Sequence, residues 1–199
     1  LGHQKFLEYA EAFDFFEPTN IELAGEVFSR NTEFRKGYEV NFATASFGQG
    51  IEMTPLQVAR AFSALANNGA LPNAYIVGGN ENRNQKQVIT PRAASQITSM
   101  LVSVVQNGFA KSAQIPGYSV AGKTGTAQIS WSALGVAKSG YSDKTIQSFV
   151  GYAPAFDPKF LILVKLNNPA ARTAEYSAVP IFRDLAKYII DYYQIPPDH

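Results

Sequence analysis

Apolar residues recur every three or four positions in four stretches of the chain, the spacing that places side chains on one face of an α-helix. The expected helices cover residues 3–14, 55–66, 91–106 and 179–193. We expect their apolar faces to be buried, and these faces consist of Phe6, Ala10 and Phe13 in the first helix, Val58, Phe62 and Leu65 in the second, Ile97, Leu101 and Val104 in the third, and Ile181, Leu185, Ile189 and Tyr192 in the fourth.

The second expected helix carries the clearest start signal. Thr54 suits the N-cap, Pro55 suits the first helical position, and Gln57 completes a capping box, in which two side chains satisfy free amides of the first turn. Thr90-Pro91 repeats this device at the start of the third helix. An Asn-Gly pair follows each of the two helices and is typical of a helix end.

Strands are expected in the gaps between these helices. A hairpin is predicted from residues 74–77 and 87–89 around a turn at 78–82. Further along, three consecutive strands are expected at residues 118–129, 145–152 and 160–166. A loop at 130–144 joins the first two, and a turn at 154–158 joins the last two. The last is a nearly unbroken apolar run, as expected for a central strand buried on both faces. Helices followed by an antiparallel meander and a closing helix indicate an α+β fold.

Composition narrows the functions open to such a fold. The 199 residues are 46% hydrophobic, enough for a core, and the net charge of +1 without blocks of like charge argues against a nucleic-acid surface. The chain has no Cys, which excludes a thiol nucleophile, a disulfide and Cys-ligated zinc. His3 and His199 lie at the two ends, so a Ser-His-Asp triad has almost nothing to be built from. The longest apolar run, residues 160–164, is too short to span a bilayer.

The sharpest chemical feature is Lys123-Thr124-Gly125-Thr126, inside the expected strand 118–129. Strand alternation puts Thr124 and Thr126 on one face, where two hydroxyls can bind a carboxylate, and Lys123 is long enough to bring its ammonium round the strand edge to the same anion. Gly125 lets a ligand lie against the backbone like an added strand, with the Thr126 amide pointing at a developing oxyanion. From these residues alone, an edge strand with an exposed lysine and two β-favouring threonines explains the motif equally well.

The surroundings of this motif resemble the penicillin-binding proteins, serine acyl-transferases that share Ser-x-x-Lys, Ser-x-Asn and Lys-Thr-Gly elements. Residues 121–128, Ala-Gly-Lys-Thr-Gly-Thr-Ala-Gln, look like the third element with its usual flanks. Upstream, residues 46–51 and Thr54-Pro55-Leu56-Gln57 resemble the preceding segment of the monofunctional, class B transpeptidases. Further similarities, in matching order and spacing, are residues 1–26, Phe149-Val150-Gly151-Tyr152-Ala153-Pro154, and residues 180–193 with Ile195-Pro196-Pro197.

The resemblance implies the penicillin-binding/β-lactamase-like transpeptidase fold, an antiparallel sheet flanked by helices. It implies a peptidoglycan D,D-transpeptidase that is acylated by D-Ala-D-Ala stem peptides and by β-lactams, without a metal or an organic cofactor. It assigns Lys123 to the proton relay and to attraction of the substrate carboxylate, and Thr124 and Thr126 to binding that carboxylate. Gly125 permits close approach, and the Thr126 amide supplies half of the oxyanion hole. Gln128 is a weaker substrate-binding candidate.

Two elements of the family are not found in this sequence. No Ser has Lys three residues later, and the single Ser-x-Asn, Ser29-Arg30-Asn31, lies beyond the place where the family has its own, so we interpret it as a loop. We therefore expect residues 1–199 to be the C-terminal part of one transpeptidase domain, inactive alone, whose nucleophile lies in an N-terminal part of the same protein. In the family's five-stranded sheet, residues 160–166 pair with a strand from that part, so we expect the fold to be incomplete at its N-terminal side and an apolar strand edge to be exposed.

Several other residues have a structural interpretation as their first choice. Trp131 and Tyr141 either line an entrance for the acceptor peptide or hold the loop in place, and we favour the second role. Residues 46–51 are expected to turn the chain into a capped helix rather than to take part in catalysis. Phe149 and Tyr152 are expected in the core.

Other functions of the same fold remain as alternatives. One is a binding or sensor module that recognises β-lactam or cell-wall peptide without turnover, and another is a structural module, against which the intact Lys123 motif argues. A hydrolysing β-lactamase fits less well, because the segment around Thr54 resembles the transpeptidases. The resemblance also implies a place on the extracytoplasmic face of the cytoplasmic membrane, with an anchoring helix outside this chain, and work in cell division or cell shape beside a glycosyltransferase and other cell-wall assembly proteins.

Overall fold

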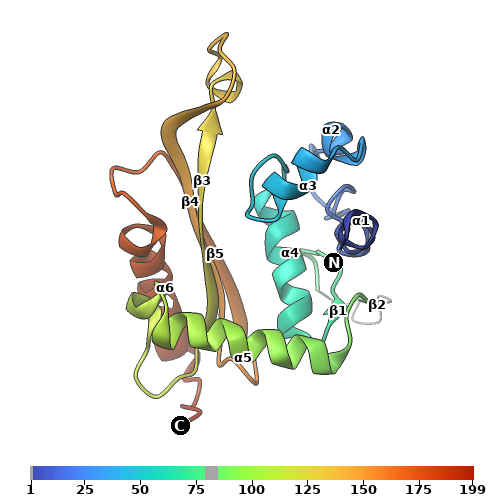
Figure 1. Ribbon diagram of the computed structural model, residues 1–199. Helices are drawn as coiled ribbons and strands as arrows, with labels where there is room; N and C mark the ends of the chain where they lie inside the picture. The colour runs from blue at the N-terminus through green and yellow to red at the C-terminus, as the bar shows by residue number, and fades with distance from the viewer. Residues whose placement is uncertain (1, 79–84) are drawn as a thin grey trace. The chain divides into compact units, whose positions relative to one another are not determined.

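The computed structural model describes residues 2–78 and 85–199, and the chain divides into two compact units, Leu1–Gln96 and Ile97–His199 (Figure 1). Helices dominate the described part of the first unit, and an antiparallel sheet with a helix alongside it forms the second. The expected α+β class is therefore confirmed.

The first unit is built around a cluster of phenylalanines. Its helices are α1 (His3–Ala12), α2 (Thr32–Arg35), α3 (Glu39–Ala45) and α4 (Pro55–Ala66). The rings of Phe16, Phe34 and Phe42 are buried together. The ring centroid of Phe34 lies 5.9 Å from that of Phe16 and 4.9 Å from that of Phe42. Aromatic pairs at such distances add stabilisation beyond the burial of their surface, so short helices such as α2 and α3 gain a shared core.

The expected capping box of α4 is present. The amide of Gln57 donates to Thr54 Oγ1 at 3.2 Å, and the amide of Thr54 donates to Gln57 Oε1 at 2.9 Å. The buried Gln57 amide group also donates to the carbonyls of Phe15 and Glu17, at 3.2 and 2.9 Å. One capping residue thus also fastens the segment that follows α1.

The expected hairpin of residues 74–77 with residues 87–89 is wrong. The strands of this sheet are β1 (Ala70–Leu71) and β2 (Lys86–Gln87), paired antiparallel. Residues 79–82, most of the expected turn, lie outside the described residues.

Local turn chemistry explains this difference. Gly69, with φ of 84°, ends α4 and turns the chain at once into β1. Its carbonyl accepts from the amides of Val88 and Ile89, at 2.9 and 3.3 Å, so the returning chain pairs here rather than further along. The Ile76 amide donates to the Glu22 carboxylate at 3.0 Å instead of to a strand.

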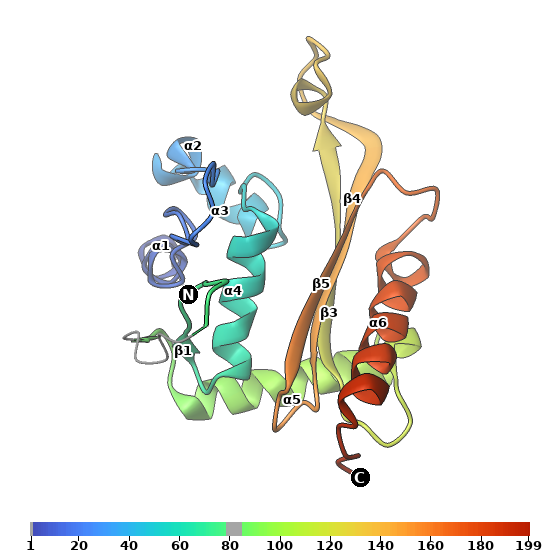
Figure 2. The ribbon, with the colours of Figure 1, turned by 180° about the vertical axis from the view of Figure 1, so that it is seen from behind.

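The second unit contains the three expected long strands and the closing helix. Helix α5 (Pro91–Asn107) begins in the first unit and continues into the second. After it come η1 (Lys111–Ala113), β3 (Ala121–Ser130), η2 (Ser132–Leu134), β4 (Tyr141–Ala153), β5 (Phe160–Asn167), η3 (Ala174–Tyr176) and α6 (Ala178–Tyr193). The strands are antiparallel in the order β3-β4-β5, and α6 lies beside β4 and β5 (Figures 1 and 2). β4 starts at Tyr141, earlier than expected, which shortens the loop.

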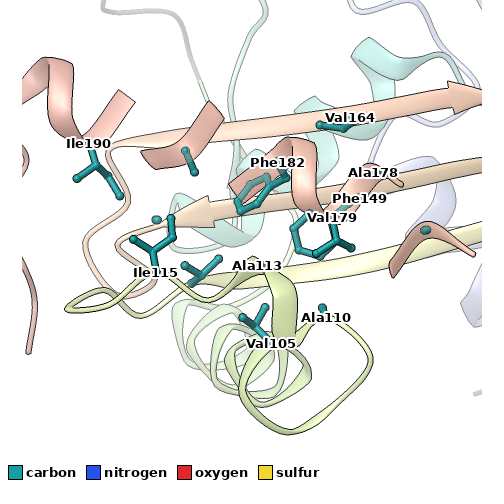
Figure 3. Close-up of a cluster of buried hydrophobic side chains, with 14 residues drawn as sticks. Val105, Ala110, Ala113, Ile115, Phe149, Val164, Ala178, Val179, Phe182 and Ile190 are labelled. Atoms are coloured by element: carbon teal, nitrogen blue, oxygen red, sulfur yellow. The ribbon is translucent and has the colours of Figure 1, made fainter. Parts of the chain in front are cut away.

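The core of this unit lies between the sheet and α6. Phe149 of β4 meets Phe182 of α6 edge to face with centroids 4.7 Å apart (Figure 3). Val164 of β5 lies opposite Phe149 in register, and Val105 of α5 joins the same cluster. Phe149 and Tyr152 are completely buried, which confirms their expected place in the core.

The expectation that residues 160–166 form a central strand is wrong within the described sheet. β4 is the middle strand, and its last five residues, 149–153, are all buried. In β5 only Val164 is buried, and one edge of β5 has no strand partner among the residues that the structure describes. An apolar run on an open edge agrees with the exposed strand edge expected from the resemblance.

The buried faces of the helices are shifted from those expected, most clearly in α6. Its buried side chains are Ala178, Val179, Phe182, Ala186 and Ile190, whereas Ile181, Leu185 and Tyr192 are 40, 45 and 68% exposed. The helix is apolar on two sides, and the sheet takes the side on which alanines allow close approach around Phe182. In α4, Ala61 and Ala64 are buried while Val58, Phe62 and Leu65 are half-buried, and in α5 Leu101 is buried as expected, with Ile97 and Val104 half-buried.

Candidate active site

The Lys-Thr-Gly-Thr motif lies near the start of β3, an outer strand of the sheet. Thr124 is paired with Phe149 and Thr126 with Gln147, so the two threonines share one face, as the alternation predicts. Gly125 is on the opposite face. The other edge of β3 has no strand partner within residues 2–78 and 85–199. The motif therefore borders an open edge along which an extended ligand has main-chain groups to bind.

The Lys123 side chain reaches this open edge. It is exposed, and its Nζ donates to the carbonyl of Thr124 at 2.9 Å. Because alternate residues of an antiparallel pair direct their N–H and C=O groups to the same side, the Thr126 amide faces the same edge as the Thr124 carbonyl. An ammonium and a main-chain N–H are thus available to an anion on one side of the strand.

Gly125 lies close to the side chain of its neighbour on β4. A Cβ at this position would lie 2.6 Å from Oγ of Ser148, its direct partner in the sheet. Real Cβ atoms do not approach other atoms so closely, so an alanine here forces the Ser148 side chain to move. The glycine keeps the backbone of the motif uncovered, which is the property that close approach of a ligand needs.

Thr126 is an exposed residue whose hydroxyl is partly engaged by the protein. Its Oγ1 accepts a long hydrogen bond, 3.4 Å, from the amide of Ala174 at the start of η3. A threonine hydroxyl has one hydrogen to donate and two lone pairs, so this contact leaves the hydrogen for a ligand. Thr124 is half-buried on the same face.

Gln128 has a role within the hairpin. Its Nε2 donates to the carbonyl of Ser142 on β4 at 3.1 Å, close to the point where the pairing of β3 and β4 shifts between Gln128 and Ser130. The Ser142 hydroxyl donates back to the carbonyl of Ile129 at 2.7 Å. The side chain is exposed, and its amide hydrogens are used at least in part by the neighbouring strand.

The hairpin tip supports the structural interpretation of Trp131. Its main chain organises the turn: the Trp131 amide donates to Gly140, and its carbonyl accepts from Leu134 and Val136. The ammonium of Lys138 lies 4.6 Å from the centre of the indole ring, a cation–π contact. Trp131 therefore holds the tip together, whereas Tyr141 is 44% exposed.

Ser29-Arg30-Asn31 has the structural role expected of it. The Asn31 side chain is buried, its Nδ2 donates to the Glu52 carbonyl at 2.8 Å, and its Oδ1 accepts from the Glu52 amide at 2.7 Å. Both polar ends of the side chain are thus used by the main chain. Residues 46–51 also form turns, with positive φ at Gly48 and Gly50.

The end of the chain fastens the segment that leads into β3. The Asp198 carboxylate accepts from the Ser119 amide at 2.9 Å, and the Tyr118 hydroxyl donates to the carbonyl of Ile195 at 2.6 Å. Burial alone would raise the pKa of Asp198, but the hydrogen bonds from Ser119 and the contact with His199 hold it below its usual value. Sequence reasoning did not assign these residues a role.

Gln147 was also missed, although it is the residue directly behind Thr126. It is completely buried on β4 and bonded at both ends of its amide. The available signal was the polar pair Gln147-Ser148 directly before the apolar run that begins at Phe149, in a strand expected to be part of the core.

The whole chain is similar to proteins of bacterial cell-wall synthesis. Residues 1–187 match the family of penicillin binding protein transpeptidase domains. Stage V sporulation protein D of Bacillus subtilis is 36% identical over 85% of this chain and 27% of its own length. A probable peptidoglycan D,D-transpeptidase of Pseudomonas aeruginosa, PbpC, is 32% identical over 100% of this chain and 35% of its own. Penicillin binding protein 3 of Mycobacterium tuberculosis, solved with ampicillin, superposes with a TM-score of 0.82 at 27% identity, over 98% of this chain and 47% of that one.

The chain belongs to the penicillin-binding protein transpeptidase family. It spans about a third of the length of the curated relatives described above, and its mixed helical and antiparallel architecture matches that of the solved Mycobacterium tuberculosis protein. The expected fold and family are therefore confirmed. PbpC carries the name of an enzyme, a probable peptidoglycan D,D-transpeptidase, and not that of a sensor. In residues 2–78 and 85–199, no helix has the length and apolar character needed to cross a membrane.

Proposed function

We propose that this chain supplies the C-terminal part of the transpeptidase domain of a class B penicillin-binding protein that cross-links peptidoglycan. The observation that carries the proposal is the Lys123 ammonium at the open edge of β3, on the same strand as the exposed residue Thr126. The share of its relatives that the chain covers, and the lack of a Ser-x-x-Lys sequence, support a nucleophile from another segment of the same protein.

The reaction is acyl transfer in two steps. The serine oxygen attacks the carbonyl carbon between two D-Ala residues, the C–N bond breaks, the departing D-Ala amine takes the proton that the serine gives up, and an ester remains. The amine of a second stem peptide then attacks this ester, forms the cross-link and restores the serine hydroxyl. A β-lactam follows the first step, with its ring amide as the bond that breaks.

Each residue of the motif has a part in these steps. Lys123 attracts the terminal carboxylate of the stem peptide and takes part in the proton relay, and Thr124 and Thr126 bind that carboxylate through their hydroxyls. The Thr126 amide contributes half of the oxyanion hole, a type of contact whose removal typically costs about 3–4 kcal/mol of transition-state stabilisation. Gly125 lets the peptide lie along the strand, and Gln128, bonded to Ser142, lines the same strand further on.

The partners and the location follow from the same reaction. The substrate is peptidoglycan, so we place the enzyme on the extracytoplasmic side of the cytoplasmic membrane, held by an anchor outside this chain. The strands that it cross-links must be polymerised by a glycosyltransferase, which we propose as a partner together with other cell-wall assembly proteins.

Intact-mass spectrometry with benzylpenicillin tests the proposal. The full-length gene product should gain one covalent adduct and this chain alone none, because the nucleophile is not in it. Lys123→Ala in the full-length protein should slow acylation at least tenfold, since it removes a charge-assisted contact to the carboxylate. Lys165→Ala, which removes an exposed lysine from β5, is the matched control and should leave the rate unchanged. An adduct on residues 1–199 alone, or a full-length protein that never reacts, would overturn the assignment.

A further inference from the structure

We infer that Gln147 is a positioning residue that sets the Thr126 hydroxyl to donate to the substrate carboxylate. It does so through the segment of residues 171–177, whose Ala174 amide contacts Thr126. This inference rests on the proposed function and adds to it the part of the protein that determines carboxylate recognition.

The side-chain amide of Gln147 binds both ends of residues 171–177. Its Nε2 donates to the carbonyl of Ala171 at 2.7 Å and to Thr145 Oγ1 at 3.1 Å, and its Oε1 accepts from the Ser177 hydroxyl at 2.5 Å. One fully buried amide is thus bonded to both ends of residues 171–177. Because rigidity is imposed at both ends, η3 between them has a fixed position over the sheet.

The 3-10 helix η3 contacts Thr126 through the amide of Ala174. Ala174 is the first residue of η3, where a helical N–H has no partner within the helix. This N–H donates to Thr126 Oγ1 at 3.4 Å, and Gln147 lies directly opposite Thr126 in the sheet. With a lone pair of Oγ1 turned toward Ala174, the hydroxyl hydrogen points away from η3. The Thr126 hydroxyl is then free to donate to a ligand on the side away from η3. A carboxylate only accepts hydrogen bonds, so it requires such a donor.

The burial of Gln147 argues for such a role over simple packing. Its neighbour two residues along on the same face, Phe149, packs in the apolar core, whereas the amide of Gln147 has polar partners at Thr145, Ala171 and Ser177. A buried amide is costly unless it is fully bonded, and here both its oxygen and its nitrogen are. What the amide adds over an apolar side chain is the fixed geometry of residues 171–177.

The experiment compares acylation of the full-length protein by benzylpenicillin and by its methyl ester, which lacks the carboxylate. The ratio of the two rate constants measures carboxylate recognition alone. Gln147→Leu should lower this ratio about tenfold, the effect of losing a hydrogen bond to a charged group, and Ser177→Ala should lower it by a smaller factor. Gln106→Leu, at an exposed glutamine of α5, is the matched control and should leave the ratio unchanged.

The outcomes separate the two proposals. A wild-type protein that reacts with neither compound overturns the proposed function. A wild-type protein that prefers the acid, with an unchanged preference in both Gln147→Leu and Ser177→Ala, overturns this inference alone, because a purely structural residue would slow both compounds equally. If Gln147→Leu does not fold, Ser177→Ala, which keeps the glutamine, decides the question by itself.

Discussion

Gly125 and Ser148 lie directly opposite each other on β3 and β4, and a Cβ on Gly125 would come within 2.6 Å of Ser148 Oγ. The Cβ of Ser148 is 4.0 Å from the same point, an ordinary contact. The obstacle to a side chain at Gly125 is therefore a single oxygen atom. Removing this oxygen by mutation therefore separates two reasons for a glycine at position 125: room for Ser148, and access for the ligand.

Gly125→Ala should destabilise the protein by about 0.5–1.5 kcal/mol, because it forces the Ser148 hydroxyl out of its present rotamer. The double variant Gly125→Ala with Ser148→Ala should recover most of that loss in urea unfolding, since the oxygen is gone. It should still be acylated slowly by benzylpenicillin in the full-length protein, because the new methyl group remains beside the ligand's path. If the double variant is acylated at the wild-type rate, the proposed role of Gly125 in ligand approach is wrong.

The Glu26 carboxylate predicts a pH dependence of stability in the first unit. It accepts from the amide and hydroxyl of Thr19, both at 2.6 Å, and from the Asn20 amide at 2.9 Å. Burial would raise the pKa of Glu26, but these hydrogen bonds, with help from the charge of Arg60, hold it below its usual value. A lowered folded-state pKa gives stability that is complete above the unfolded pKa of about 4.3 and is lost as the pH falls through the folded value.

Glu26→Gln should therefore cost about 1 kcal/mol at pH 7, an amount reduced by the solvent near this carboxylate. The difference from wild type should shrink in urea titrations as the pH is lowered below about 4. Glu52→Gln is the matched control, because the Glu52 side chain is exposed and only its main chain is bonded to Asn31. A Glu26→Gln difference that stays constant with pH would mean that these hydrogen bonds do not favour the charged form.

The buried hydroxyl pair of Thr98 and Tyr152 allows a double-mutant cycle in the second unit. Their oxygens are 2.7 Å apart, and both residues are at most 4% exposed. Burial raises the pKa of Tyr152, partly offset by the hydrogen bond to Thr98, so the phenol stays protonated and neutral. The pair is a structural contact between α5 and the end of β4.

Tyr152→Phe and Thr98→Val should each cost about 1–3 kcal/mol, because each leaves the other hydroxyl buried without its partner. The double variant should cost less than the sum of the two, with a coupling of about 1 kcal/mol in thermal or urea unfolding. Strict additivity would show that the two hydroxyls do not stabilise each other in solution.

The elements that sequence patterns predicted well are those whose local signals agree with their surroundings. Thr54, Pro55 and Gln57 define the start of α4 by chemistry within one turn, and the structure has the same bonds. In α6 the periodicity fits two faces, and the choice between them depends on how closely the sheet can approach Ala178 and Ala186, which no local pattern contains. β1 and β2 are two residues each, too short for a periodic signal, and are set by Gly69.

The candidate site divides in the same way. The Lys-Thr-Gly-Thr motif and its alternation were predictable, because both are properties of consecutive residues. The contacts that place Gln147 and Ala174 beside Thr126 were not predictable. Gln147 and Ala174 lie 21 and 48 positions further along the chain, and the path of the loop between them depends on buried hydrogen bonds. The attachment of Asp198 to Ser119 is of the same kind.

Trp131 is the one tryptophan of the sequence, and it lies at the tip of the β3–β4 hairpin beneath Lys138. β5 pairs with β4 only from residue 146 onward, so this tip extends past the three-stranded part of the sheet (Figure 1). Tryptophan emission from this protein is therefore a local optical signal: it records changes at the hairpin tip, while circular dichroism follows the helices. Unfolding curves from the two methods need not coincide, and the gap between them measures how independently the hairpin frays.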